Sequence, residues 1–109
     1  MSKASPSLPF GTLDLLIFRT LAGGPRHGYG ILQQIHDVSD RLLRIEEGSL
    51  YPALHRLETT GFLKAEWAMS GNRRAKYYSL TAKGRRQLAE ERRNWERVAE
   101  GVARVLQFA

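Results

Sequence analysis

The segment from Leu13 to Leu21 constrains the fold of this chain more than any other. Apolar residues at positions 13, 15, 16, 17, 18 and 21 nearly encircle the helix that we expect here, with Thr12 as its N-cap. A helix that is apolar on all sides must be buried on more than one of them. The whole chain has 109 residues, which is one domain with little to spare for a second covering layer. The segment therefore predicts a partner subunit.

The chain carries an excess of positive charge. It has 17 Lys+Arg against 11 Asp+Glu, a formal charge of +6 and a pI of about 10.2. A pI above about 9 is typical of nucleic-acid binders, although anionic membranes and acidic partners attract the same charge. Cysteine is absent, which removes disulfides, thiolate metal sites and thiol nucleophiles and fits a reducing cytosol. The sequence shows no signal peptide and no stretch near the roughly 18 apolar residues of a membrane helix, so we expect a cytoplasmic protein without membrane attachment.

A second helix is predicted after the break at Gly23–Pro25. It begins at about Gly28, and its apolar face consists of Ile31, Ile35 and Val38. His27 and Tyr29 lie at its start, which is the positive end of the helix dipole and a ready site for anions. Packing at the helix start and contact with a phosphate are equally open for these two side chains.

A third, amphipathic helix is predicted from about Gly48 to Gly61. Its apolar stripe consists of Leu50, Ala53, Leu54 and Leu57. Opposite this stripe and on its flanks lie Ser49, Tyr51, Pro52, His55 and Arg56, none of which is a carboxylate. Because proline lacks an N–H and is tolerated only in about the first turn, the helix begins little before Gly48. Hydroxyl, imidazole and guanidinium groups opposite a leucine face suit an anionic partner.

A β-hairpin follows the third helix. Leu63 to Met69 alternate in polarity, Ser70 to Arg74 are typical of a turn, and Ala75 to Leu80 form the return strand. Three basic residues therefore lie at or beside the tip. Next to two tyrosines and with no acid expected nearby, they favour contact with phosphates or the minor groove over simple solvation. These residues are Arg73, Arg74 and Lys76.

The last helix is predicted to be long, from a cap at Thr81 to about Leu106. Apolar residues recur along it at the spacing of a coiled coil, with Glu91 as one interruption. The repeat consists of Leu88, Trp95, Val98, Val102 and Val105. We expect this seam to pack against the first helix and against its own copy in a second subunit.

Three helices, a hairpin and a long final helix make a mainly α (α+β) fold, a winged helix-turn-helix with an appended dimerisation helix. At this point the sequence resembles the PadR-like transcriptional regulators, over about residues 10 to 106. Each matching motif is weak alone, but five in order at the family's spacing are specific. They are His27-Gly28-Tyr29, Ser49–Leu54, Leu57-Glu58 with Gly61–Leu63, Arg74–Tyr78 and Leu80–Gly84.

The resemblance implies a DNA-binding repressor that acts as a homodimer, here of the short subfamily with one C-terminal helix. Two-fold symmetry then predicts a palindromic operator. The first and last helices of the two subunits would interlock. The expected interface consists of Leu13, Leu16, Ile17, Leu88, Trp95, Val98, Val102 and Val105. The expected DNA contacts are His27, Tyr29, Ser49, Tyr51, Pro52, His55, Arg56, Arg73, Arg74 and Lys76.

Trp95 is the candidate effector-binding residue. In short members that resemble this chain, a tryptophan pair lines a cavity that sandwiches flat aromatic molecules, so a small aromatic effector is an expected partner. Those members carry an acid one turn later, where this chain has Ala99. Simple burial of Trp95 in the interface is the favoured alternative, given how much area a tryptophan buries.

Residues 1–9 hold two prolines and three serines and are expected to form a flexible tail. We expect residues 10–80 to form the winged helix-turn-helix DNA-binding domain and residues 81–109 the dimerisation helix.

Two other classes of function make different demands on the sequence. No nucleophile elbow, glycine-rich phosphate loop or zinc motif is present in the sequence, so we expect no enzyme, no catalytic residue, no cofactor and no metal. A winged-helix module that binds protein and not DNA has the same fold. The acid-free face of the third helix and the basic hairpin tip argue against it.

Overall fold

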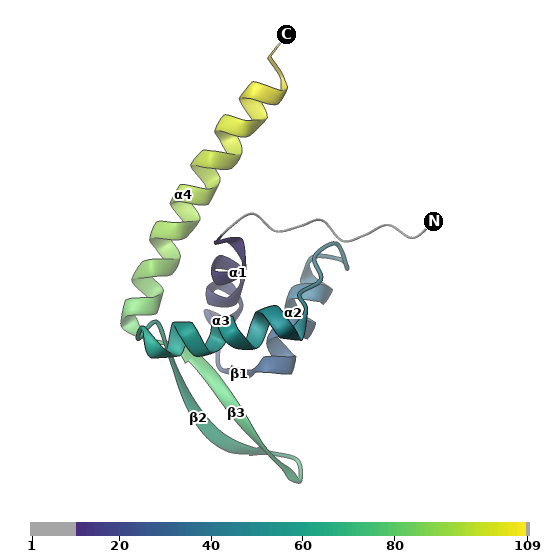
Figure 1. The fold of residues 1–109 in the computed structure, drawn as a ribbon, viewed down its shortest axis with the longest axis vertical. Coiled ribbons are helices and arrows are strands. Elements are labelled where there is room, and N and C mark those ends of the chain that lie inside the picture. The colour runs from purple at the N-terminus through teal and green to yellow at the C-terminus, as the bar shows by residue number, and fades with distance from the viewer. Residues whose placement is uncertain (1–10, 109) are drawn as a thin grey trace.

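The structure is a computed structural model that describes residues 11–108, and the expected flexible tail over residues 1–9 lies outside them. It confirms a mainly helical α+β fold with a winged helix-turn-helix and a long last helix (Figure 1). In chain order the elements are α1 (Thr12–Leu21), β1 (Arg26–His27), α2 (Gly28–Val38), α3 (Glu47–Thr59), β2 (Leu63–Ser70), β3 (Arg73–Leu80) and α4 (Ala82–Leu106).

The core lies where α1, α2 and α3 meet the base of the wing. Its largest fully buried side chains are Phe18, Ile17, Leu21, Ile31, Leu50, Leu54, Leu57 and Leu63. Phe18 also meets Phe62 edge to face, with ring centres 5.8 Å apart. The expectation that Ile17 contacts a partner subunit is wrong. Its side chain is fully buried within the protomer, so it has no surface to offer.

The sheet has three antiparallel strands in the order β1-β3-β2. β2 and β3 form the wing, and their register runs from Leu63 opposite Leu80 to Ser70 opposite Arg73. The turn is therefore shorter than expected, and Arg73 and Arg74 belong to β3 and not to the loop. Gly71 has a φ of +65°, which is the left-handed conformation that such a tight turn needs. The two-residue strand β1, paired with Tyr77 and Tyr78, was not predicted because it is too short to show any alternation.

The start of α1 differs from the sequence expectation, and the start of α3 agrees with it to within one residue. The N-cap of α1 is Gly11, with a φ of +85° and no side-chain cap, so Thr12 is the first helical residue and not the cap. α3 begins at Glu47, which puts Pro52 in its second turn and leaves the carbonyl of Gly48 without its helical donor. Both Gly48 and Pro52 are exposed, so solvent can hydrogen-bond to that carbonyl.

The joint between the wing and α4 is fixed by a small set of local contacts. The hydroxyl of Thr81 accepts a hydrogen bond from the Gly84 N–H at 3.0 Å, as expected for the cap of α4, and donates to the Gly61 carbonyl at 2.7 Å. Lys83 donates to the Thr60 carbonyl at 2.6 Å. Gly84 is buried, and a Cβ there would collide with the carbonyl of Phe62. These contacts set the direction in which α4 leaves the domain.

Most of α4 extends away from the core as an arm (Figure 1). Its base packs on α1 through Leu88, which is half-buried, but further along Trp95, Val98 and Val102 are 46%, 55% and 51% exposed. Among residues 11–108, nothing therefore covers most of this stripe. No helix among the described residues is both long and apolar enough to cross a bilayer.

Candidate nucleic-acid interface

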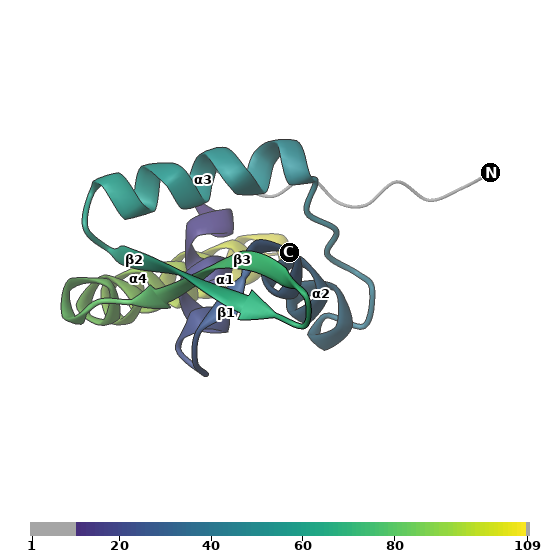
Figure 2. The same cartoon turned by 90° about the horizontal axis from the view of Figure 1, so that it is seen from below.

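A cleft of about 480 Å³, here called the wing cleft, opens between the wing and the first turns of α2 and α3. Figure 2 views the molecule from the side toward which the wing points, and it shows α3 alongside the sheet. Six of the ten predicted DNA contacts line this cleft: His27, Tyr29, Tyr51, Arg73, Arg74 and Lys76. The structure thus brings together side chains from four elements, β1, α2, α3 and β3, that the sequence could only place separately.

The ring of Tyr51 packs against the backbone of Gly28. A Cβ on Gly28 would lie 2.6 Å from a Tyr51 ring carbon, so this close approach of α3 to α2 requires glycine. Burial, followed by the charges of Glu47 and Tyr78, raises the pKa of Tyr51 above its ordinary value. The phenol therefore keeps its proton at neutral pH and presents an O–H donor to the cleft.

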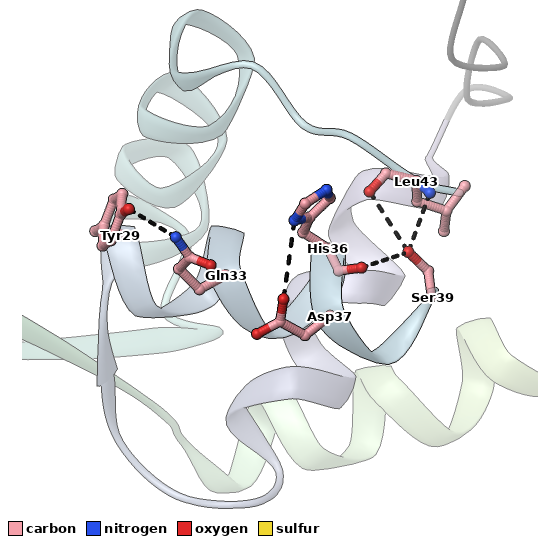
Figure 3. Close-up of polar contacts among 6 residues, drawn as sticks. All are labelled: Tyr29, Gln33, His36, Asp37, Ser39 and Leu43. Carbon is pink, nitrogen blue, oxygen red and sulfur yellow. Dashed lines mark hydrogen bonds and ion pairs between the residues drawn. The ribbon is translucent and has the colours of Figure 1, made fainter. Parts of the chain in front are cut away.

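His27 caps α2. Its Nδ1 accepts a hydrogen bond from the Gly30 N–H at 3.0 Å, and its ring meets Tyr77 edge to face with centres 5.5 Å apart. Capping accounts for the histidine at this position, while the second ring nitrogen is left as a donor in the neutral imidazole. Tyr29 is exposed beside it, and its hydroxyl accepts from Gln33 Nε2 at 2.6 Å (Figure 3).

The basic side chains of the wing differ in what holds them. Lys76 donates to Glu58 of α3 at 2.9 Å, and this hydrogen bond is the main cause that raises the pKa of Lys76 above its ordinary value. The expectation that no acid lies near this group is therefore wrong, because Glu58 comes from an element 18 residues earlier. Within residues 11–108, Arg73 and Arg74 have no carboxylate partner.

Arg56 is exposed like the other predicted contacts on α3, but its head group is held by a carboxylate. Its guanidinium donates to Asp14 of α1 at 2.6 Å, and this hydrogen bond raises the pKa of Arg56 further above its ordinary value. Arg56 is thus exposed, as expected from its place on a flank of α3, but its head group lies toward α1 and pairs with Asp14, which the sequence did not indicate. The negative charge of Glu91 on α4 also contributes to raising the pKa of Arg56.

The remaining predicted contacts on α3 lie outside the wing cleft. Ser49, Pro52 and His55 are exposed on the helix surface. They form the part of α3 that is free to approach a partner beside the cleft.

Trp67 also belongs to the wing cleft, although it was not among the DNA contacts predicted from the sequence. The tryptophan lines the wing cleft, is 60% exposed, and has the guanidinium carbon of Arg74 at 5.0 Å from its ring centre. The alternation of side chains along β2 indicates that Trp67 lies on the same face as Leu63. That Arg74 of β3 shares this face follows only from the register of the two strands.

A second cleft of about 500 Å³, here called the arm cleft, lies between the start of α1 and the apolar side of α4. It is lined by Thr12, Trp95, Val98 and Val102, among others. Leu13 and Leu16 are half-buried against the protomer core, and Val105 is exposed beyond the cleft. Among the described residues, no cluster of His, Asp or Glu has a geometry that could hold a metal ion.

The fold and the basic, aromatic cleft define a winged helix-turn-helix protein. The model of the Transcriptional regulator PadR-like family matches residues 17–90, and the chain belongs to that family. It is therefore a DNA-binding transcriptional regulator and not an enzyme.

Relatives support the assignment. "Transcriptional regulator Rv3488" of Mycobacterium tuberculosis is 36% identical over 88 residues, which cover 81% of this chain and 79% of that protein. A PadR family transcriptional regulator from Eggerthella lenta has a TM-score of 0.79 at 34% identity, over 91% of this chain and 85% of that one. Bacillus subtilis PadR, solved in complex with operator DNA, has a TM-score of 0.68 at 25% identity, over 75% of this chain and 47% of that one.

Proposed function

We propose that this regulator is a ligand-responsive repressor that binds a palindromic operator as a homodimer. The observation that carries the proposal is the wing cleft, where the start of α3 faces the same space as two arginines that have no carboxylate partner in the described part of the chain. Such a surface fits a duplex, whose phosphates attract cations while its major groove admits a helix. We infer that the winged helix-turn-helix of residues 10–80 grips DNA and that residues 81–109 dimerise. The protein would then act in the cytoplasm, beside the chromosome.

In this proposal α3 enters the major groove. Ser49, Tyr51, Pro52 and His55 approach the duplex, with the Tyr51 hydroxyl and the Ser49 hydroxyl as donors to phosphates or base edges. His27 and Tyr29, at the start of α2, contact the phosphate backbone of the DNA. The operator-bound Bacillus subtilis relative supports this arrangement by analogy.

The wing and the ion pairs of α3 have separate roles in the proposal. Arg73 and Arg74 bind phosphates or probe the minor groove, since no carboxylate within residues 11–108 neutralises them. Lys76 and Arg56 act chiefly by positioning: their pairs with Glu58 and Asp14 tie α3 to the wing and to α1.

Dimerisation through α4 would cover its exposed stripe. Trp95, Val98, Val102 and Val105 supply most of that surface, and Leu13, Leu16 and Leu88 supply its edge next to the core. Burying one such side chain fully is worth about 1.5–3 kcal/mol, so a handful can hold a dimer. Two-fold symmetry then spaces the half-sites about 34–36 Å apart or a multiple of that distance.

The ligand response is assigned to the arm cleft. Trp95 and the valines beside it offer an apolar space next to α1, suited to a flat aromatic molecule. In a Trp67→Phe background, where Trp95 is the one remaining tryptophan, planar dyes and phenolic acids are expected to quench its fluorescence. No quenching across such a panel would leave Trp95 with a packing role alone.

The proposed function is tested by a mobility shift on the promoter region of the chain's own gene. We expect the wild-type chain to shift this duplex at a protein concentration at least about tenfold lower than a shuffled duplex of equal length and composition, because specific complexes exceed non-specific ones. Elution from heparin only at high salt would accompany this result. A chain that shifts neither duplex and leaves heparin at low salt would instead be a protein-binding winged-helix module.

A further inference from the structure

Trp67 occupies an unusual position on the wing. Side chains alternate between the two faces of β2, so Leu63, Ala65, Trp67 and Met69 share one face. Near the base this face is core, with Leu63 only 2% exposed, but toward the tip of the wing it is open, and Trp67 and Met69 are 60% and 62% exposed. The exposed Trp67 side chain is therefore not part of the hydrophobic core formed by the described residues.

Arg74 shares this face with Trp67. The register pairs Met69 with Arg74 and Trp67 with Lys76, which puts the cationic groups of β3 beside the exposed part of β2. The guanidinium carbon of Arg74 lies 5.0 Å from the Trp67 ring centre, within the range of a cation–π contact. Lys76 is held instead by Glu58, whereas within residues 11–108 no carboxylate pairs with Arg74.

A guanidinium held by an aromatic ring differs from one held by a carboxylate. The ring restricts the rotamers of the arginine but does not neutralise its charge, and the in-plane N–H groups stay available as a fork for a phosphate. Less side-chain entropy is then lost when the phosphate binds. The indole beside it presents apolar area of the kind that packs on sugars and base edges in the minor groove.

Resting on the proposed function, we propose that Trp67 and Arg74 form one DNA-contacting unit. The Trp67 ring holds the Arg74 guanidinium toward a phosphate at the edge of the minor groove, and the indole packs on the adjoining deoxyribose. The partner is therefore the sugar–phosphate backbone beside the groove that α3 enters. Such a contact contributes to all duplexes alike, because it reads no base edge.

The test uses a duplex selected from a random library by the wild-type chain, together with a random-sequence duplex of equal length. Trp67→Leu keeps apolar bulk but removes the π-face, and it should weaken binding to both duplexes by about tenfold. Trp67→Phe keeps an aromatic face and should stay within about threefold of wild type. Ala68→Ser, exposed on the opposite face of the same strand, is the matched control and should bind as wild type.

A double-mutant cycle separates a unit from two independent contacts. After Arg74→Ala, adding Trp67→Leu should cost less than about threefold, since its partner is already gone. Additive losses, or a Trp67→Leu variant that binds both duplexes within twofold of wild type, would overturn the inference while the proposed function stands. A wild-type chain that selects no duplex would overturn both.

A second measurement needs no change at the wing. In Trp95→Phe, Trp67 is the one remaining tryptophan and serves as its own reporter. Its emission should be quenched and shifted to shorter wavelength by the selected duplex, because the indole leaves water on binding. Emission unchanged at saturating duplex would overturn the inference, even if Trp67→Leu proved too unstable to assay.

Discussion

The wing and the arm formed by α4 both project from the core, yet their exposed surfaces differ in kind. On the arm, Arg92 and Arg104 each pair with a glutamate one turn away, and the exposed stripe is apolar and includes Trp95 with three valines. On the wing, Arg73 and Arg74 have no such neighbours within residues 11–108, and Arg74 lies over the exposed ring of Trp67. The two projections therefore suit different partners. The arm suits a second copy of α4, and the wing suits a polyanion.

The largest expected effect comes from putting a charge on the arm's stripe. Val102→Asp would bury an unpaired carboxylate from each subunit in the proposed interface, a cost of several kcal/mol. We expect a monomer in sedimentation experiments and a loss of at least about 100-fold in operator affinity, because one half-site binds alone. Arg93→Ala changes the net charge equally on the exposed opposite side and should remain dimeric. If the Val102→Asp variant stayed dimeric, the dimer interface could not lie on this stripe of α4.

The next effect is on the wing. Replacing Arg73 and Arg74 together by Ala should weaken binding to all duplexes by more than about tenfold, and should reduce the slope of log affinity against log salt by about 2. Titrations at several salt concentrations measure both quantities. Arg85→Ala with Arg86→Ala makes the same change of charge at two exposed positions at the start of α4, and should leave the slope closer to wild type. Equal slopes for the two double variants would reduce the wing's role to net charge alone.

A smaller effect is expected from Gly28→Ala, at the junction behind the cleft. The added methyl group would press on the Tyr51 ring, and such overpacking costs about 1–3 kcal/mol of stability. Thermal unfolding should show a lower Tm, and DNA affinity should fall because Tyr51 is displaced. Adding Tyr51→Ala should recover stability but not affinity. Recovery of both would exclude Tyr51 from the interface.

The smallest effect is predicted for the pair between Arg56 and Asp14. The arginine side chain is more than half exposed, so a double-mutant cycle with Arg56→Gln and Asp14→Asn should give a coupling of no more than about 1 kcal/mol in stability. DNA affinity should change by less than about threefold in Arg56→Gln. A loss as large as that of the wing double variant would instead make Arg56 a direct contact, as the sequence alone indicated.

Local chemistry accounts for what the sequence could predict. The amphipathic stripe of α3, the end of that helix near Gly61 and the cap at Thr81 each depend on residues a few positions apart. What could not be predicted joins distant positions. Arg56 pairs with Asp14 across 42 residues, and Lys76 pairs with Glu58 across 18. Helical periodicity shows on which side a long side chain begins, but the position of its charged head depends on how the elements pack.

The wing cleft shows the same division. The sequence predicted that basic and aromatic side chains would gather here, but not which of them lie in contact. Trp67 lies beside Arg74 because of the strand register, and Tyr51 packs on Gly28 because of how α3 packs on α2. Ile17 was misassigned for a related reason. The apolar residues around α1 indicated that more than one side is buried, but not which side packs within the protomer.

The central claim, that two wing clefts held by the arm grip one duplex, is tested most directly by binding stoichiometry. A labelled duplex carrying the selected palindrome is titrated at a concentration far above the Kd, and the equivalence point is read by anisotropy. We predict two chains per duplex, and loss of binding when 5 base pairs, half a helical turn, are inserted between the half-sites. An equivalence point at one chain per duplex, with affinity unaffected by the insertion, would contradict the account.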